Sequence, residues 1–583
     1  MILFYDFEVF KHTWLVVIVD AIAQKETIIV NDSAKMKEFY ESHRNYIWIG
    51  YNSNSYDAWI LRSILGGYNP YSMSQWIIQK DCKGWEFDRE LSKFQVLGFD
   101  ARWSNIAPGL KTLEAFMGDD IRETEVPFDL DRPLTEEEIA QTIKYCRNDV
   151  NETMKVFCHA KNEFLAHWDL IKTFDLPIAS ISKTKAQLTA NILNCVKTER
   201  NDEWDFNLET PCYLIKKYRN IVEWFENPEN RNLDANFEAE VAGIKVSYGW
   251  GGAHGALENY FDKGLIVHCD VTSYYPSLMI EWGLLSRNSQ TPEKFKEIYE
   301  KRVALKKAGK KKEQAPLKIV LNSTYGASGD KYNPLFDPRQ AHRVCANGQL
   351  FLTLLLEMLE GIATPFNVNT DGIFFKIEDE SKLPLYYERC KKWEEVTRMG
   401  LGHDKYRACY QRDVNNYIME LEDGKLERKG AYVKGLSVLD NDLKIVNEAM
   451  VQYFVNGVPP EKTIQDCHNM LDFQKVFKLS SKYNNALQGC TFGKEKGKKV
   501  WNGDGRLLTD RSYRIFASTG SEGAVYKKKD GKNPEKFANC PDNCFIYNES
   551  LRDKKTDEFP NLDKKWYIDL AWYRIKQFKG EIK

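Results

Sequence analysis

Three short segments in a fixed order constrain this chain more than any other feature. They are 270–277 (DVTSYYPS), 318–326 (KIVLNSTYG) and 369–371 (NTD). The aspartate of the first segment follows an apolar run and that of the third precedes one, which predicts both carboxylates, Asp270 and Asp371, at the edges of strands. Rigid strands can hold two metal ions about 3.5–4 Å apart, the spacing used for in-line phosphoryl displacement. The pattern therefore predicts a nucleotidyl transferase acting on a nucleoside triphosphate.

A second set of carboxylates lies in the N-terminal third of the chain. Asp6 and Glu8 end an apolar run and are two residues apart, so they project from one face of an extended strand. Asp57 precedes a helix-like run, and Tyr145 and Asp149 are four residues apart on a helical pattern. Four hard oxygen ligands without cysteine or histidine favour Mg²⁺ or Mn²⁺ over Zn²⁺.

These segments resemble the motifs of one enzyme family. The first three are similar to the D-x-x-S-L-Y-P-S, K-x-x-x-N-S-x-Y-G and D-T-D motifs of family B DNA polymerases, and the closest variety is the small bacteriophage type. The N-terminal set resembles the Exo I, Exo II and Exo III motifs of 3′→5′ proofreading exonucleases, with the Exo II asparagine at Asn52. The third polymerase motif departs from the family, because Asn369 stands where an aspartate is usual.

The resemblance implies an α/β (α+β) fold, with an RNase H-like exonuclease domain followed by a right-hand polymerase. Two helical segments, 293–307 and 314–325, separated by a basic break, predict the fingers. The implied domains are a 3′→5′ exonuclease at 1–165, a helical connector at 166–235, the first part of the palm with motif A at 236–290, the fingers with motif B at 291–330, the second part of the palm with motif C and a K-x-Y-like segment at 331–438, and the thumb and C-terminal region at 439–583.

The resemblance also assigns roles in nucleotide addition. Asp270 and Asp371 would hold two Mg²⁺ or Mn²⁺ ions, and Tyr275 would lie under the sugar and exclude a 2′-hydroxyl. The residues expected to bind the triphosphate and the nascent base pair are Arg302, Lys306, Lys318, Asn322 and Tyr325. The residues expected to contact DNA are Asn52, Tyr248, Gly251, Gly252, Lys429 and Tyr432. The glycine-rich segment at 247–255 (SYGWGGAHG) and the K-x-Y-like segment at 427–434 (ERKGAYVK) each have one residue more than the family pattern.

In the N-terminal half the resemblance implies hydrolysis of a phosphodiester. Asp6, Glu8, Asp57 and Asp149 would hold two further Mg²⁺ or Mn²⁺ ions, and Tyr145 would orient the attacking water. Lys111 lies in a segment similar to one that such exonucleases carry between Exo II and Exo III. It either contacts the cleaved phosphate or is a solvated lysine.

Composition limits the partners and the compartment. The formal charge is only −2, so DNA affinity has to come from local basic clusters. Thirteen cysteines without disulfide-like or zinc-like spacing favour reduced thiols in a cytoplasmic protein, in the host cytoplasm if a phage encodes it. No apolar run is long enough to predict a membrane span. The expected partners are primer-template DNA, deoxynucleoside triphosphates and a processivity or single-strand-binding accessory protein.

We expect template-directed DNA synthesis with 3′→5′ proofreading, in phage genome replication. The alternatives are an exonuclease or repair and editing protein with a degenerate polymerase half, for which Asn369 is the hint, a protein-primed replicase, and a non-catalytic DNA-binding protein. The last would not need two sets of metal-spaced carboxylates. The intervals 270–318 and 326–371 are too short for the insertions of protein-primed members, so we expect neither protein priming nor strong intrinsic processivity.

Overall fold

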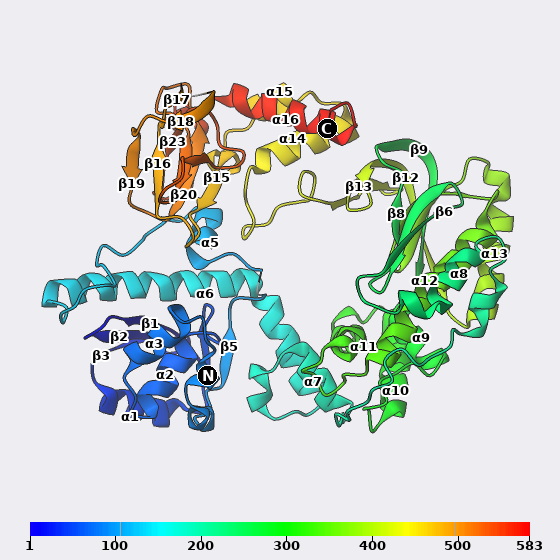
Figure 1. Cartoon of the computed structure of the whole chain (residues 1–583), viewed down its shortest axis with the longest axis horizontal. Coiled ribbons are helices and arrows are strands. Elements are labelled where there is room, and N and C mark those ends of the chain that lie inside the picture. The colour runs from blue at the N-terminus through cyan, green and yellow to red at the C-terminus, as the bar shows by residue number, and fades with distance from the viewer. Residues whose placement is uncertain (105, 496, 583) are drawn as a thin grey trace.

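The computed structural model of the chain describes residues 1–104, 106–495 and 497–582. The described residues form helices and five β-sheets, in agreement with the expected α/β (α+β) class (Figure 1). None of the helices in this described part is both long enough and apolar enough to cross a membrane.

The N-terminal sheet has five strands in the order β3-β2-β1-β4-β5. β1 pairs antiparallel with β2 and parallel with β4. Its strands are β1 (Ile2–Val9), β2 (Trp14–Asp20), β3 (Lys25–Val30), β4 (Ile47–Gly50) and β5 (Gly98–Asp100). Helices α1 (Ser33–His43), α2 (Asp57–Leu65) and α3 (Pro70–Ile78) cover one face, and the long helix α6 (Glu136–Thr173) crosses the other.

Alternation along β1 decides which side chains meet which helices. Tyr5 packs into the core formed with α1, α2 and α3, whereas Phe4 packs into the core formed with α6. Asp6 and Glu8 have the same parity as Phe4, so they lie on the α6 side of the sheet. The prediction that these two carboxylates share a face is confirmed.

A second, larger sheet has nine strands, antiparallel throughout, in the order β14-β13-β12-β9-β11-β10-β8-β7-β6. The strands are β6 (Asn236–Val241), β7 (Ile244–Gly249), β8 (His254–Ala256), β9 (Tyr260–Val271), β10 (Thr364–Asn369), β11 (Gly372–Lys376), β12 (Leu401–Asp413), β13 (Asn416–Leu421) and β14 (Leu426–Lys429). Helices α8 (Arg219–Glu226), α9 (Tyr274–Glu281), α12 (Pro338–Leu359) and α13 (Leu383–Thr397) share one hydrophobic core with this sheet.

The predicted helices at 293–307 and 314–325 are both present, as α10 (Pro292–Lys307) and α11 (Lys311–Gly329). Gly309 turns the chain between them with a φ of 72°, a conformation that favours glycine. Helix α7 (Lys185–Ile192), from the segment expected to be a helical connector, packs against α11.

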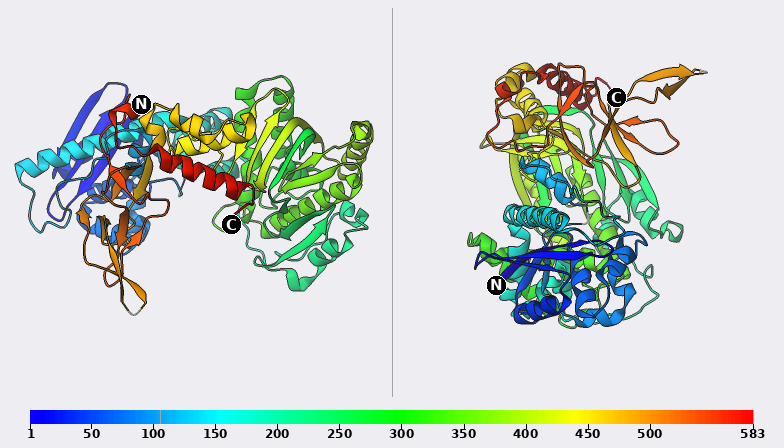
Figure 2. Two further views of the ribbon diagram at one scale, coloured as in Figure 1. Left: turned by 90° about the horizontal axis from the view of Figure 1, so that it is seen from above. Right: turned by 90° about the vertical axis from the view of Figure 1, so that its left-hand side faces the viewer.

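The C-terminal region combines helices with two small sheets and a projecting hairpin (Figure 2). Its helices are α14 (Lys444–Asn456), α15 (Pro460–Gln465) and α16 (Lys564–Phe578). One sheet contains β15 (Lys475–Lys478), β20 (Ser512–Ala517) and β23 (Cys544–Ile546). The other contains β16 (Asn485–Gln488), β19 (Arg506–Leu508), β21 (Val525–Lys528) and β22 (Glu535–Lys536), and the hairpin is β17 (Phe492–Glu495) with β18 (Lys498–Trp501).

A buried arginine of this region docks it on the N-terminal half. Arg514 is 0% exposed, and its guanidinium donates to the carbonyl oxygens of Ala115 at 3.0 Å and Asp119 at 2.8 Å. Ala115 belongs to α5 (Leu110–Met117). Within its own region Arg514 donates to Gln474 Oε1 at 2.9 Å and to the Glu549 carbonyl at 2.7 Å. Burying a charge costs free energy unless such partners replace water, so this contact is specific.

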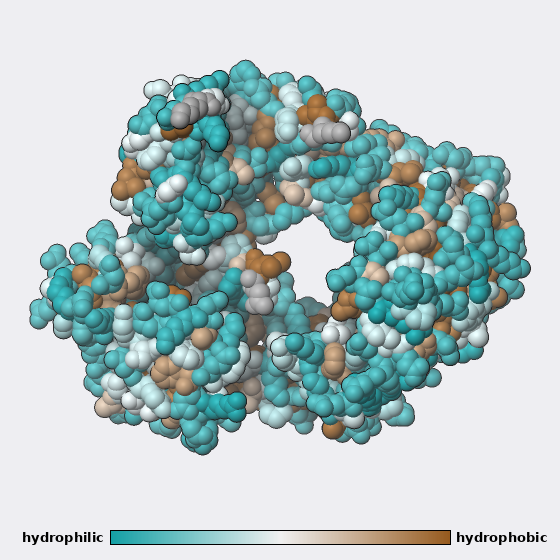
Figure 3. Space-filling view, in the orientation of Figure 1, coloured by the Kyte–Doolittle hydropathy of each residue, from teal (hydrophilic) through white to brown (hydrophobic). Residues whose placement is uncertain are grey.

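The docking closes the molecule around an opening, which Figure 3 shows. The C-terminal region contacts 115–123 on one side, and α14 and α16 share a core with β12 and β13 on the other. The closure uses no insertion in 270–318 or 326–371. The expectation of weak intrinsic processivity assumed that only such insertions could surround DNA. The opening contradicts this assumption, because the C-terminal region closes it without either insertion.

Replacing Arg514 tests the docking contact. Arg514→Met keeps the length of the side chain but removes the guanidinium donor. The Ala115 carbonyl keeps the Gly118 amide at 3.0 Å, whereas the Asp119 carbonyl loses the bond from Arg514, at a cost of about 1–3 kcal/mol. The amides of Ile121 and Leu551, which bond to the carbonyls of Asn548 and Gly118 at 2.8 Å, should then exchange hydrogen much faster. Hydrogen exchange read by mass spectrometry checks this.

The amides of β9, far from the contact, provide the control and should keep their protection. Unchanged exchange at both sites would show that Arg514 does not hold the two parts together.

Candidate active sites

The structure gathers the four N-terminal carboxylates at one place. Asp6 and Glu8 come from β1, Asp57 begins α2, and Asp149 comes from α6. The backbone amide of Phe7 donates to Asp57 Oδ1 at 3.1 Å, which ties α2 to β1. Glu8, Asp57 and Asp149 are only 6%, 3% and 8% exposed.

Burial and mutual repulsion disfavour the charged forms of these four carboxylates. Burial raises the pKa of Asp6 and of Glu8 well above the usual range, and the neighbouring carboxylates raise both further. Burial likewise raises the pKa of Asp57 to about 7, although the Phe7 amide opposes the shift. A buried group of like charges is stabilised by protons or by a metal ion, and the carboxylate oxygens suit Mg²⁺ or Mn²⁺. The expected absence of cysteine is wrong, because the potential ligand atoms of Asp6, Glu8 and Cys146 all lie within 4.8 Å of one another.

Lys111 belongs to this cluster, so the alternative of a solvated lysine is wrong. Its side chain is 13% exposed, and its Nζ lies 2.5 Å from Asp149 Oδ1 and 2.9 Å from Glu114 Oε1. The same ammonium lies 4.6 Å from the centre of the Tyr145 ring, a cation–π distance. The sequence analysis missed Glu114, although its position three residues after Lys111 on α5 was a usable signal.

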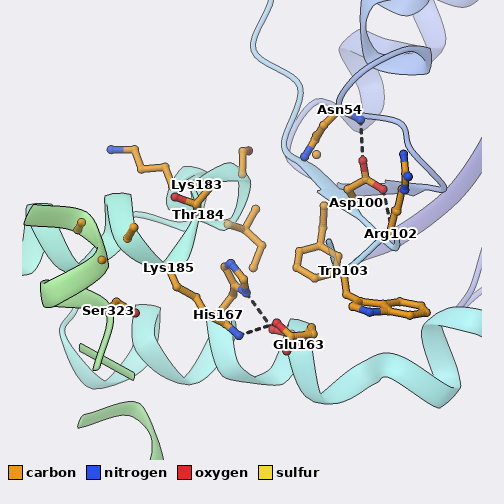
Figure 4. A pocket seen from close by; sticks show the side chains of 17 residues that line it. Asn54, Asp100, Arg102, Trp103, Glu163, His167, Lys183, Thr184, Lys185 and Ser323 are labelled. Carbon is orange, nitrogen blue, oxygen red and sulfur yellow. Dashed lines mark hydrogen bonds and ion pairs between the residues drawn. The ribbon is translucent and has the colours of Figure 1, made fainter. Parts of the chain in front are cut away.

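Asn52 lies in the turn that leads to Asp57, with a φ of 61°. Its amide oxygen accepts from Arg102 at 3.1 Å, so the side chain is held beside the cluster rather than within it. Next to this turn a cavity of about 470 Å³ runs between the N-terminal sheet and helices α7 and α11 (Figure 4). Trp103 lines it from one side and Ser323, of the 318–326 segment, from the other.

Asp270 and Asp371 form the second site, on the nine-stranded sheet. Asp270 lies on β9 and pairs with Gly372 of β11, so Asp371, in the turn just before β11, is its neighbour. The Val271 amide donates to the Asp371 carbonyl at 2.9 Å. A Cβ at Gly402 of β12 would lie 2.5 Å from Asp270 Oδ1, so this position needs glycine to admit the carboxylate.

The sequence analysis missed two further residues of this site, His268 and Asp404. The potential ligand atoms of His268, Asp270 and Asp404 all lie within 4.8 Å of one another. His268 precedes Asp270 by two residues on β9 and therefore shares its face, and Asp404 pairs with His268 across β12. Loss of hydration raises the pKa of Asp371, His268 opposes the shift and Asp270 adds to it.

The glycine-rich segment abuts the turn that carries Asp371. The Thr370 amide donates to the Ala253 carbonyl at 3.1 Å, and a Cβ at Gly252 would lie 3.6 Å from Thr370 Oγ1. A Cβ at Gly251 would meet open space. Tyr248, in contrast, is 1% exposed and shares a hydrogen bond with Thr353 Oγ1 at 3.0 Å, so its side chain is a core residue that DNA does not reach. We correct its expected role on this ground.

The expected nucleotide-binding residues on α9 and on the α10–α11 hairpin differ in how accessible their side chains are. The rings of Tyr275 and Tyr325 lie 4.1 Å apart between centroids. Lys306, Lys318 and Asn322 are exposed, and neither lysine has an ion-pair partner in the described part of the chain. Arg302 is only 8% exposed, because its guanidinium donates to Ser273 Oγ and to Gln314 Oε1, the latter at 3.2 Å. A triphosphate would have to compete for this arginine.

Lys429 ends the second strand of the predicted hairpin and Tyr432 follows it. The turn of this hairpin, at Gly424, has a φ of 81°. Lys429 ends β14 and is close enough to Asp371 to oppose the rise of that carboxyl's pKa. The ring of Tyr432 is covered by the guanidinium of Arg574 at 4.7 Å. The structure thus brings Lys429 to the second site and gives Tyr432 a packing contact.

No family model matches the chain, and comparison with curated proteins shows a partial similarity to a DNA polymerase. The chain is 29% identical over 140 residues to DNA polymerase 1 of Saccharolobus solfataricus. The match covers 23% of this chain and 15% of that protein. The similarity supports a relationship to DNA polymerases in general.

The pKa of Asp57 generates a test of the carboxylate cluster. The folded-state pKa of about 7 lies above the unfolded value near 4, so in the metal-free protein the contribution of Asp57 to stability is lost as the pH rises from about 4 to above 7. Asp57→Asn keeps an acceptor for the Phe7 amide and carries no charge. With a chelator present it should unfold roughly 2–4 °C above the wild type at pH 8 and above it by a smaller margin at pH 5.

Thermal unfolding at the two pH values measures this difference. Saturating Mg²⁺ at pH 8 should reverse the order, because the wild type gains an ion that the variant binds less well. A difference between the two proteins that does not change with pH would contradict the cluster's electrostatics.

Proposed function

We propose that the chain is a DNA-directed DNA polymerase of the family B type with a 3′→5′ proofreading exonuclease. The observation that carries the proposal is that two carboxylate sites form in different parts of one chain, each from segments that resemble the motifs of one activity. The nine-stranded sheet would be the palm, the α10–α11 hairpin the fingers, and the region after 439 the thumb. The resemblance to small phage enzymes supports a role in phage genome replication.

In the proposed nuclease site the chain's own residues hold and orient the substrate. Asp6, Glu8, Asp57 and Asp149 would bind two Mg²⁺ or Mn²⁺ ions, which when bound lower the pKa of a water and stabilise charge on the phosphate. Tyr145 lies on the same face of α6 as Asp149, one turn away, in position to orient the attacking water. Lys111 joins Asp149 to α5 and supplies a positive charge near the cleaved phosphate.

In the proposed polymerase site Asp270 and Asp371 would bind the two ions that activate the primer 3′-hydroxyl and neutralise the triphosphate. Lys318 and Lys306, which are exposed and unpaired in the described structure, would bind phosphate oxygens as pyrophosphate leaves. Asn322 and Tyr325 would cover the nascent base pair. Lys429 would contact the primer backbone, and the glycines at 251 and 252 would let the template strand approach.

The two sites should be separable by substitution. Asp371→Ala should abolish primer extension and leave Mg²⁺-dependent digestion of single-stranded DNA near normal, whereas Asp6→Ala should do the reverse. Asp423→Ala, which removes an exposed carboxylate of the β13–β14 turn, is the matched control and should retain both activities. Extension and digestion assays on one labelled primer check all three variants.

Each outcome bears on a different function. Digestion without extension in the wild type would favour the nuclease with a degenerate polymerase half, and neither activity would favour a non-catalytic DNA-binding protein. Loss of both activities in either folded single variant would contradict two separate sites.

Tyr275 provides a test of substrate choice. Its ring packs against Tyr325, and a Cβ at Gly348 would lie 3.6 Å from it, so it is held from two sides. Tyr275→Val should open space under C2′ and raise incorporation of ribonucleotides relative to deoxynucleotides by about 10- to 200-fold. Tyr274→Phe, which keeps the neighbouring ring, should leave the ratio unchanged. Single-nucleotide kinetics measure both, and an unchanged ratio for Tyr275→Val would place the discrimination elsewhere.

A further inference from the structure

A lysine of the C-terminal region reaches the edge of the N-terminal carboxylate site. Lys478 is the last residue of β15, and a methyl group added at Gly109 would collide with its ammonium. Gly109 is the residue before α5, two positions from Lys111. Lys478 is exposed, and its ammonium has no hydrogen-bond or ion-pair partner within the described chain. An ammonium held against another part of the chain without a counterion is available to an anion.

The surroundings of Lys478 are predominantly positive. Loss of hydration around the ammonium lowers the pKa of Lys478, Glu123 opposes this shift, and the nearby charges of Arg102, Arg511 and Lys111 lower the pKa further. Glu123 is already engaged, because its carboxylate accepts the backbone amides of Arg511 and Ser512 at 2.9 and 2.8 Å. The arrangement therefore attracts negative charge beyond what the protein supplies.

A cleft between the two regions leads to the candidate nuclease site. It has a volume of about 890 Å³ and is lined by Tyr145 and Lys144 of α6. Thr509 and Asp510 of the C-terminal region form the opposite wall. A strand that approaches Tyr145 through this cleft would therefore pass along the C-terminal region.

The position of Lys478 is fixed by the docking contact. Lys478 pairs with Ser512 between β15 and β20, and Val476 of the same strand pairs with Arg514. Arg514 in turn donates to the carbonyls of Ala115 and Asp119. The same strand pair thus anchors the C-terminal region and places the ammonium at Gly109.

We propose that Lys478 binds a backbone phosphate of the single strand whose 3′ end lies at the nuclease carboxylates, so that the C-terminal region completes the nuclease's DNA-binding site. The inference rests on the proposed nuclease activity. A lysine contacts phosphate without reading the base, which suits a site that accepts any 3′ end. It would position the strand and take no part in the chemical step.

Digestion of a single-stranded oligonucleotide at several salt concentrations tests the proposal. Lys478→Ala should raise KM about tenfold with little change in kcat, as expected for one lost charge-assisted contact. It should also reduce the slope of log KM against log salt by about 0.7, the share of one phosphate on a single strand. Lys478→Arg should restore most of the affinity, and primer extension should be unaffected.

Two further variants sharpen the test. Lys482→Ala removes an exposed lysine four residues along, whose ammonium lies 5.4 Å from the Tyr483 ring, and should behave as the wild type. Gly109→Ala keeps every charge but displaces the Lys478 ammonium, and its backbone φ of −71° allows alanine, so it should raise KM in the same direction.

The outcomes separate this inference from the proposed function. A wild type that digests single strands, with Lys478→Ala unchanged in KM and salt slope, would overturn the inference alone. A wild type without nuclease activity would overturn the proposed nuclease and the inference with it. A fall in kcat at unchanged KM would assign Lys478 a structural role and would also contradict the proposal.

Discussion

Repulsion between carboxylates held at strand ends is the constraint on which this structure depends. Asp6 and Glu8 share a face of β1 with Asp149 above them on α6, and Asp270 lies against Gly402 in the other sheet. Neither group could persist on flexible loops, since the side chains would swing apart into water. The two sheets and their covering helices keep the charges together, and a divalent ion is the partner that would offset the cost.

The second organising contact is the docking of the C-terminal region through Arg514. Because one buried guanidinium satisfies carbonyls from both regions, the two halves of the chain are joined at a specific place. This contact closes the opening seen in Figure 3 and brings Lys478 to Gly109.

Local patterns in the sequence predicted the elements that carry the sites. The strand edges at Asp270 and Asp371, the shared face of Asp6 and Glu8, and the helices α10 and α11 follow from apolar runs and periodicity. What could not be predicted depends on long-range register and packing. Asp404 meets His268 only because β12 pairs with β9 in one register, and the buried positions of Tyr248 and Arg302 depend on neighbours distant in sequence. The docking bonds between Glu123 and 511–512 span almost 400 residues, and no local signal marks them.

The most direct test of the central claim is where divalent ions bind. Anomalous diffraction from crystals grown with Mn²⁺ and primer-template DNA locates each ion without reference to activity. The account predicts Mn²⁺ between Asp270 and Asp371 and, separately, among Asp6, Glu8, Asp57 and Asp149. Anomalous peaks absent from both clusters, in crystals that bind Mn²⁺ elsewhere on the chain, would contradict it.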